Sequence, residues 1–397
     1  MKRFIRYLAF ALVTAVSLTA ATVVRADDED PGTQANRYVR NDLVSDIPIK
    51  GINPTIDPVL RNAWGVAFTP SASPFWIADN ASGCATLYDG AGVEVTTVQV
   101  AIPLPDNSVP STACQPASTQ TNPPPPSPAA PTGLVWNPTT STTTGFLVPG
   151  TNIPASFIFA TEDGTLSAWA GTIADTTRAV IAVDNSGSGA VYKGLVVGVN
   201  VHGVFLFATN FNAGTIDVFA PNGSAGFRPA TNLEIEGDFT DPKIPAGFAP
   251  FGIENIDGNL FVTYAKQNAE KHDDVAGPGN GFVDVFDTDG HFLRRFASRG
   301  PLNSPWGMTR ASFAFGRFSG DILIGNFGNG KINAFDSQGQ FLDELDRPNG
   351  KPLVTQGLWK LTLGGGRNSS SDTLYFTAGP NDETNGLFGT IMPVSKK

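Results

Sequence analysis

Short apolar strands alternate with polar turns along most of the chain, and the pattern recurs six times. Each repeat opens with a Gly or an aromatic residue before an apolar strand, and two further strands follow. Several third strands end in turns of Asp or Asn with Gly, which supply the positive φ of a tight hairpin. The opening segments are AWGVAF (63–68), PTGLVW (131–136), YKGLVV (192–197), PFGIEN (250–255), PWGMTR (305–310) and GLWKLTL (357–363).

The spacing of these segments indicates a repeat architecture. Successive repeats begin 68, 61, 58, 55 and 53 residues apart, and such recurrence is the signature of a repeat architecture. Four antiparallel strands per repeat, arranged radially, form a β-propeller, in which each blade buries faces that it cannot bury alone. We therefore predict an all-β, six-bladed β-propeller over residues 38–394. An open solenoid is the alternative, and it normally needs capping repeats that we do not see.

The two ends of the repeat region complement each other. The last repeat stops shortly after GLFGTI, without a fourth strand, whereas the stretch YVRNDLVSD (38–46) precedes the first repeat as an isolated strand. Pairing of the two would close the ring and cover an exposed sheet edge. We expect the N-terminal strand to complete the last blade.

Residues 1–26 have the features of a signal peptide. A basic start precedes a largely apolar run over residues 7–24, and VRA (24–26) offers a small-residue cleavage site. A membrane anchor is the alternative, but the run is short for a bilayer core of about 30 Å. We predict cleavage, a flexible segment over 27–37, and a soluble protein that is secreted or periplasmic.

A proline-rich insertion contains one of the two cysteines of the chain. Residues 101–132 contain ten prolines and predict an extended loop between the first two blades. Cys114 lies in this loop, and Cys84 lies in the first blade at the same end of the propeller. An exported chain meets oxidising conditions, which favours a disulfide; two free thiols are the alternative. The loop is either a spacer or a partner-binding or lid element.

Charge narrows the range of partners. Removal of residues 1–26 leaves 22 basic and 36 acidic residues, a net charge of −14. An acidic surface without basic clusters argues against nucleic acid and anionic membranes as partners. Solubility alone also accounts for such a charge.

Several phrases resemble a known family. NDLVSD, NAWGVAF, FIFATEDGTLSAW, GTIDVF, HDDVAGPGNGFVDVF, GPLNSPWGM and LYFTAGPND look like exported, largely uncharacterised bacterial propellers related to the NHL-repeat, TolB-like six-bladed type. The resemblance covers about residues 38–392. It implies the fold and export, and it brings no activity or catalytic residue. Gluconolactonase-like and paraoxonase-like calcium enzymes and streptogramin lyase are more distant propellers, so their link is an analogy of fold.

In a propeller, the loops that leave second strands and enter first strands gather at one mouth of the central channel. These segments carry acids and amides together with aromatic residues, which suits a ligand pocket. Oxygen-rich side chains also suit Ca²⁺, although turns need the same residue types. The candidate metal ligands are Asp79, Asn80, Glu162, Asp163, Asn210, Asn326 and Asp382.

The loop KQNAEKHDDVAGPGNG (266–281) is longer than its counterpart in the fifth repeat. It concentrates ionisable side chains at the same mouth, and long loops in compact domains are often functional. His272 and Asp273 are the candidate acid–base residues, with a solvated polar loop as the alternative. The candidate ligand-binding residues are Trp64, Lys266, Asp274, Trp306 and Trp359.

No catalytic motif decides the function. The sequence lacks a G-x-S-x-G elbow, an H-E-x-x-H metal motif, a Walker loop and a dinucleotide fingerprint. We therefore expect a binding or interaction module for a small molecule, glycan or protein at the loop-rich mouth. A calcium-dependent hydrolase of lactonase or esterase type, or a lyase, is the alternative.

Overall fold

The computed structural model describes residues 35–70, 73–95, 98–117 and 126–394. The predicted signal peptide and most of the predicted segment 27–37 lie outside these ranges. Among the described residues, the regular structure consists of strands and three short 3₁₀ helices. The 3₁₀ helices are η2 (Asn80–Ser82), η3 (Ser186–Ser188) and η4 (Gly316–Phe318).

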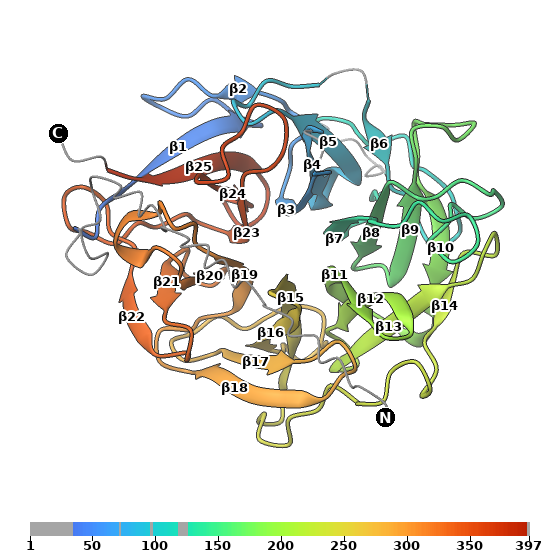
Figure 1. Ribbon diagram of the computed structural model, residues 1–397. Helices are drawn as coiled ribbons and strands as arrows, with labels where there is room; N and C mark the ends of the chain where they lie inside the picture. Colours follow the sequence, from blue (N-terminus) through green and yellow to red (C-terminus); the bar gives the residue numbers. More distant parts are fainter. Residues whose placement is uncertain (1–34, 71–72, 96–97, 118–125, 395–397) are drawn as a thin grey trace, which may run out of the picture.

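Six sheets surround a central channel, which confirms the six-bladed propeller (Figure 1). Their strands are antiparallel, apart from β2 (Thr55–Ile56) in the sixth sheet. The first blade has β3 (Ala63–Ala67), β4 (Phe75–Asp79), β5 (Cys84–Tyr88) and β6 (Val100–Ala101). The second has β7 (Pro131–Trp136), β8 (Phe157–Thr161), β9 (Thr165–Trp169) and β10 (Val180–Asp184). The third has β11 (Tyr192–Asn200), β12 (Gly203–Asn210), β13 (Thr215–Pro221) and β14 (Phe227–Pro229).

The other three blades follow the same order. The fourth has β15 (Phe248–Ile256), β16 (Asn259–Lys266), β17 (Phe282–Phe286) and β18 (Phe292–Ser298). The fifth has β19 (Pro305–Arg310), β20 (Ile322–Asn326), β21 (Ile332–Phe335) and β22 (Phe341–Glu344). The sixth has β23 (Leu358–Leu363), β24 (Leu374–Ala378) and β25 (Leu387–Pro393), with β1 (Tyr38–Ser45) and β2 (Thr55–Ile56) on its outer side.

The sixth blade joins the two ends of the described chain. Strand β1 pairs antiparallel with β25, from Tyr38 opposite Pro393 to Ser45 opposite Leu387, and β2 lies parallel to β1. In Figure 1 the blue strand β1 lies directly beside the red strand β25. Tyr38 also stacks on Phe315 of the fifth blade, with 4.9 Å between the ring centroids. The N-terminal strand therefore contacts two blades.

Apolar side chains between the blades form the core. Trp76 of the first blade stacks on Phe157 of the second at 4.3 Å, for example, within one large buried cluster. Because both faces of a blade are covered, the inner strands lose the alternation of a half-exposed sheet. Segments such as FIFAT in β8 are consequently buried at every position.

The six first strands line the channel and approach each other closely. Each carries a glycine or a lysine at the point of closest approach, and Gly307 is the clearest case. A Cβ added there would lie 2.2 Å from the backbone oxygen of Trp359 in the next blade. Threonine hydroxyls also link neighbouring blades: Thr132 donates to Tyr192 O at 2.7 Å, and Thr209 to Phe251 O at 2.8 Å.

The proline-rich insertion is anchored to the first blade. Cys84 and Cys114 form a disulfide, as predicted, and the Cys114 amide donates to Ser82 O at 2.9 Å. These contacts hold the described part of the insertion beside η2, which begins at the mouth residue Asn80. Within the described ranges, no helix has the length and apolar character needed to cross a bilayer.

The close approach at Gly307 predicts a large effect of a single methyl group. Gly307→Ala should lower the free energy of unfolding by about 1–3 kcal/mol or more, because a backbone oxygen must move to admit the Cβ. The urea midpoint measures this effect. Gly187→Ala is the matched control, since nothing lies within 4 Å of a Cβ there. Equal midpoints for the two variants would contradict the proposed tight packing.

Candidate functional site

Three buried tryptophans close the channel just below the mouth. Trp64 stacks on Trp359 with 3.4 Å between the ring centroids, and Trp306 packs edge-on against both. Phe327 covers the other face of Trp359 at 4.0 Å. We call Trp64, Trp306 and Trp359 the tryptophan plug. The sequence predicts these residues as open aromatic walls, whereas they are buried against each other.

Hydrogen bonds hold the plug to the polar layer above it. Trp306 Nε1 donates to Lys193 O at 3.1 Å, and Trp359 Nε1 donates to Asn62 Oδ1 at 3.0 Å. Buried indole N–H groups usually need such a partner. The plug therefore supports the side chains of the mouth.

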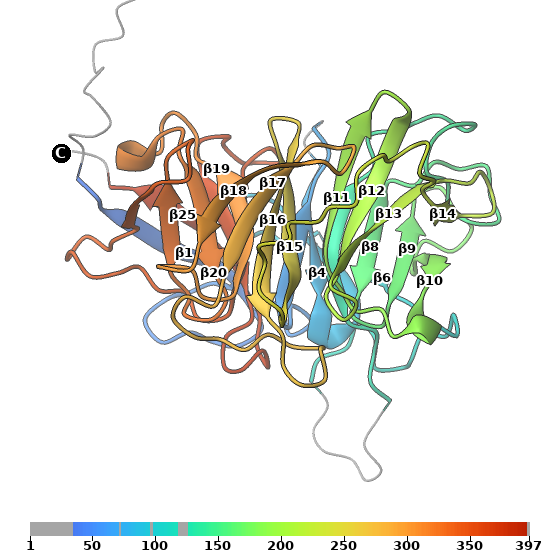
Figure 2. The ribbon, with the colours of Figure 1, turned by 90° about the horizontal axis from the view of Figure 1, so that it is seen from below.

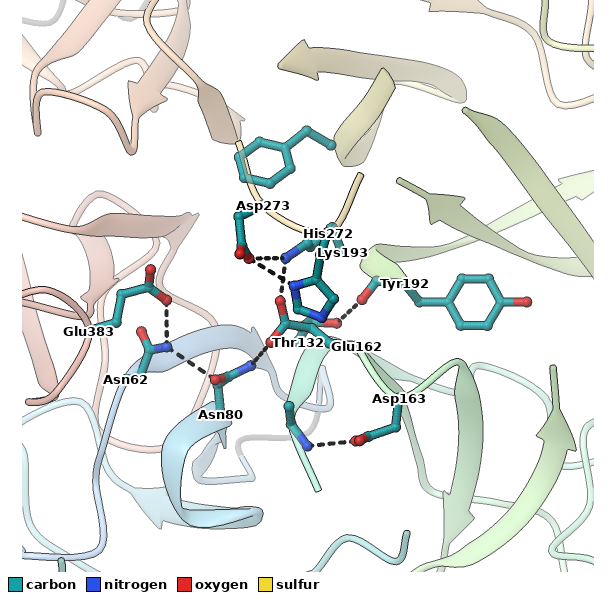
Figure 3. Close-up of polar contacts among 12 residues, drawn as sticks. Asn62, Asn80, Thr132, Glu162, Asp163, Tyr192, Lys193, His272, Asp273 and Glu383 are labelled. Carbon is teal, nitrogen blue, oxygen red and sulfur yellow. Dashed lines mark hydrogen bonds and ion pairs between the residues drawn. The ribbon is translucent and has the colours of Figure 1, made fainter. Parts of the chain in front are cut away.

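Lys193 lies at the centre of the mouth (Figure 3). It belongs to β11, and its side chain is only 2% exposed. The ammonium forms an ion pair with Glu162 Oε1, lies 3.6 Å from Asp273 Oδ1, and lies 5.4 Å from the centre of the Trp64 ring. A buried ammonium needs compensating charge, and Glu162 supplies most of it.

A chain of amides continues from Glu162 across the mouth. Asn80 Nδ2 donates to Glu162 Oε2 at 2.8 Å, so both carboxylate oxygens of Glu162 have partners. Asn62 Nδ2 donates to Asn80 Oδ1 at 3.1 Å and to Glu383 Oε2 at 2.8 Å. Glu383 can reach Asn62 because Asn381, Asp382 and Glu383 all have positive φ, which curls their loop inward.

His272 and Asp273 form the exposed part of the site. Their Nδ1 and Oδ1 atoms lie 2.9 Å apart, and their side chains are 46% and 64% exposed. The hydrogen bond that His272 Nδ1 donates to the Asp273 carboxylate raises the pKa of His272 above its ordinary value, and the same bond lowers the pKa of Asp273. A ligand can therefore reach the pair. The raised pKa means that His272 binds its proton more tightly than an ordinary histidine does.

Three further carboxyl groups lie at the same mouth. Burial raises the pKa of Asp163 and of Asp274 above the ordinary value for aspartate, and it raises the pKa of Glu383 to about 7. We call Glu162, Asp163, Asp273, Asp274 and Glu383 the mouth acids. Among the described residues, only Lys193 and His272 form ion pairs with them.

The predicted metal ligands do not converge as a set. Glu162 and Asn80 are in contact at the mouth, and Asp163 lies beside them, where it accepts a bond from the Ala130 amide at 2.8 Å. Asp382 is exposed. Asp79, Asn210 and Asn326 were also expected to face the mouth. Their side chains instead form hydrogen bonds with groups of the protein, because carboxylate and amide groups are suitable partners for the polar atoms of buried turns.

The contacts of these three residues show this directly. Asp79 is fully buried, where its Oδ2 accepts from Thr86 Oγ1 at 2.8 Å. Asn210 donates to Asp217 at 3.0 Å, and Asn326 donates to Pro301 O at 2.8 Å. Asp79, Asn210 and Asn326 thus have partners within the protein, and nothing in their contacts supports their assignment as metal ligands.

One smaller group has metal-like spacing. Ligand atoms of Glu162, His272 and Asp273 lie within 4.8 Å of one another. Calcium takes six to eight oxygen ligands, whereas this group offers two carboxylates and an imidazole. The Lys193 ammonium already pairs with one of those carboxylates. The donor set therefore does not fit a resident calcium ion.

The two remaining predicted residues, Lys266 and Asp274, belong to the 266–281 loop. Lys266 is exposed, and its carbonyl accepts from the Val275 amide at 2.7 Å, which closes the base of the loop. Asp274 points inward, and its Oδ2 is buried without a hydrogen-bond partner among the described residues. Asp274 is thus better placed than Lys266 to face a ligand at the channel axis.

Sequence reasoning missed Asn62 and Lys193 as site residues, and it chose Asp382 rather than the adjacent Glu383 as a candidate metal ligand. Lys193 carried a signal, since a lysine at the start of an otherwise apolar inner strand must find a buried partner. Glu383 follows Asp382 directly, and only the left-handed turn decides which of the two points inward. Asn62 has no such local signal.

Comparison with known proteins places the chain in a family. No family model matches it. It is 30% identical over 342 residues to the uncharacterized protein L690 of Acanthamoeba polyphaga mimivirus, covering 85% of this chain and 81% of that protein. The chain belongs to the family of L690. The bacterial origin implied by the resemblance is not supported by this viral relative.

Solved structures resemble the chain weakly. Virginiamycin B lyase from Staphylococcus aureus aligns over 90% of this chain and 99% of its own, with 13% identity and a TM-score of 0.48. A gluconolactonase from Xanthomonas campestris aligns over 84% and 86%, with 12% identity and a TM-score of 0.46. These likenesses carry no inference about the activity of the L690 family.

The raised pKa of Glu383 predicts that the free energy of unfolding decreases as the pH rises. The folded state binds this proton more tightly than the unfolded chain, so stability should fall as the pH rises from about 4.5 to about 7. Glu383→Gln removes the ionisation and keeps an oxygen for Asn62. Relative to the wild type, its free energy of unfolding should rise by up to about 3 kcal/mol between pH 5 and pH 8.

Urea denaturation at the two pH values measures the effect. Glu270→Gln is the control, since it removes an exposed glutamate from the long loop at the same mouth. If Glu383→Gln shows the same pH dependence as the wild type, Glu383 does not bear a buried proton.

Proposed function

We propose that the protein is a binding module and that the mouth of its channel binds a small polar molecule with a cationic group. One observation carries this proposal: five carboxyl groups gather at a mouth where the Lys193 ammonium and the His272 imidazole are their only ion-pair partners among the described residues. The burial that raises the pKa of Asp163, Asp274 and Glu383 also indicates that these groups lack sufficient positive charge. An incoming cation would supply it.

Accessibility decides where the ligand would make contact. Asp273 is the most exposed of the ion-paired residues at the mouth, so its carboxylate can reach a ligand without a rearrangement. Glu162 is saturated by Lys193 and Asn80. The tryptophan plug offers no free ring face, which disfavours a glycan held by stacking. A small amine fits these conditions better than a sugar or a protein segment.

A metal-assisted hydrolase is the second candidate function. The spacing of Glu162, His272 and Asp273 favours it, and the His272–Asp273 pair has the geometry of an acid–base dyad. The ion pair between Lys193 and Glu162 opposes it, since an ion would have to displace the ammonium. Because the same donor set does not fit a resident calcium ion, the calcium-dependent hydrolase is the less favoured candidate.

Calorimetry with putrescine tests the proposal. Putrescine should bind the purified protein in low-salt buffer at pH 7.5, and D-glucose and citrate should bind more weakly or not at all. Asp273→Asn should weaken putrescine binding about tenfold, the usual worth of a hydrogen bond between charged groups. Asp287→Asn is the matched control. Asp287 Oδ2 lies 3.0 Å from His291 Nδ1, and this pair is not at the mouth.

Two results would overturn the cation site. One is the absence of putrescine binding, and the other is an equal loss of affinity in both aspartate variants. Melting with calcium and with a chelator, together with metal analysis of the purified protein, addresses the alternative. A bound calcium whose removal lowers the melting temperature would support the hydrolase, and an unchanged melting temperature would contradict it.

We also propose that the protein is exported, to the periplasm or the medium. The composition of residues 1–26 and the Cys84–Cys114 disulfide support this, because disulfides persist in oxidising compartments. Mass spectrometry of the protein expressed with its own N-terminus is the test. The mature chain should begin after Ala26, whereas an intact chain retained in the cytosol would contradict export.

A further inference from the structure

The far end of the channel holds a cavity that the proposed function does not use. Each first strand starts beside the mouth residues and runs away from them, so its late residues line the opposite end of the channel. Figure 2 shows the propeller from the side, with β11 and β15 running between its two ends. A cavity of about 230 Å³ opens there. Its apolar lining includes Val66, Phe68, Val135, Trp136 and Val197. We call this space the far-end cavity.

A narrow waist separates the far-end cavity from the mouth. The waist is lined by backbone at Gly65, Gly133, Gly194 and Gly307, and it encloses about 10 Å³, roughly the room for one water molecule. Trp306 of the tryptophan plug closes it on the side of the mouth. A ligand in the far-end cavity therefore cannot reach Lys193 or the mouth acids.

An ion pair spans the channel beside the waist. Lys360 Nζ, from β23 of the sixth blade, pairs with Glu254 Oε2, from β15 of the fourth. The two side chains are only 15% and 25% exposed, and both line the far-end cavity. Among the described residues, the ammonium has no second acceptor and Glu254 Oε1 has no donor. Each charged group therefore keeps hydrogen-bonding capacity for a ligand.

The cavity is divided between apolar and charged walls. The apolar side comes from β3, β7 and β11 of three consecutive blades, and the ion pair comes from the opposite side of the ring. Trp136 and Phe68 are only partly buried, so they leave aromatic surface accessible, unlike the buried tryptophan plug. Apolar walls with a few placed polar groups are typical of small-molecule sites.

We propose that the far-end cavity binds a small zwitterion with an apolar body, of the class of the free apolar α-amino acids. The ligand carboxylate accepts from Lys360, its ammonium donates to Glu254, and its side chain packs on the Val135 and Trp136 wall. The two charges of the ligand match the two charges of the protein, so no charge is left unpaired on binding. This site is independent of the cation site at the mouth.

Fluorine NMR with 5-fluorotryptophan in the purified protein tests the proposal, with L-phenylalanine as the probe. Trp136→Phe assigns one of the six tryptophan signals. L-Phenylalanine should shift the Trp136 signal and leave the signals of the tryptophan plug unchanged. N-acetyl-L-phenylalanine and phenethylamine each lack one charge, and each should bind at least about tenfold more weakly. Saturating putrescine should not compete.

Variants locate the site. Lys360→Met should weaken L-phenylalanine binding at least about tenfold, and so should Thr362→Trp, which fills the cavity and keeps the ion pair. Lys331→Met is the matched control, because its pair with Glu344 at 2.6 Å lies outside the cavity. An unchanged circular dichroism spectrum shows that a variant is folded. If Lys360→Met is not folded, the binding measured with Thr362→Trp tests the proposal instead.

Three outcomes would overturn the proposal. The first is the absence of a Trp136 shift at millimolar L-phenylalanine. The second is equal affinity for either single-charge analogue, which would remove the zwitterion as the ligand class. The third is competition by putrescine, which would place both molecules at the mouth. Failure of the putrescine site alone leaves the far-end cavity unaffected, so the two proposals fail separately.

Discussion

The close packing of six strands around one axis constrains everything else in this protein. Neighbouring inner strands approach so closely that a methyl group at Gly307 would overlap the backbone of the next blade. The ring therefore has almost no internal volume at its waist. Chemistry is confined to the two ends of the axis, and the tryptophan plug keeps these ends apart. A propeller with a wider ring would instead offer a continuous channel.

At the mouth, Lys193 is the counter-ion of the Glu162 carboxylate. Lys193 emerges from an inner strand directly beneath the acids, and its ammonium holds Glu162 in place. Because two amides extend this contact to Glu383, the blades around the mouth are electrostatically coupled. The arrangement leaves Asp273 and His272 as the outward-facing members, so selectivity for a ligand rests on a loop supported by a rigid centre.

The architecture could be predicted from the sequence because the same pattern of apolar strands and polar turns occurs six times. The Gly and aromatic residues that open each repeat, the turns and the Cys84–Cys114 pair each point to one local structure. The site was harder, since the direction of a side chain depends on single backbone angles. Asp382 and Glu383 are adjacent and chemically similar, yet only Glu383 faces Asn62. Asp79 looked like a ligand and is instead an internal partner of Thr86.

The pairing of β1 with β25 has a consequence for how the chain acquires its shape. The first strand of the ring to be synthesised pairs with the last, and about 350 residues separate the partners. Until β25 exists, β1 has no sheet to join, and contacts of such long sequence separation form slowly. During synthesis the growing chain therefore carries an unmatched strand, whose apolar side needs shielding from other chains. The final blade can therefore form only after the last strand of the ring has been synthesised.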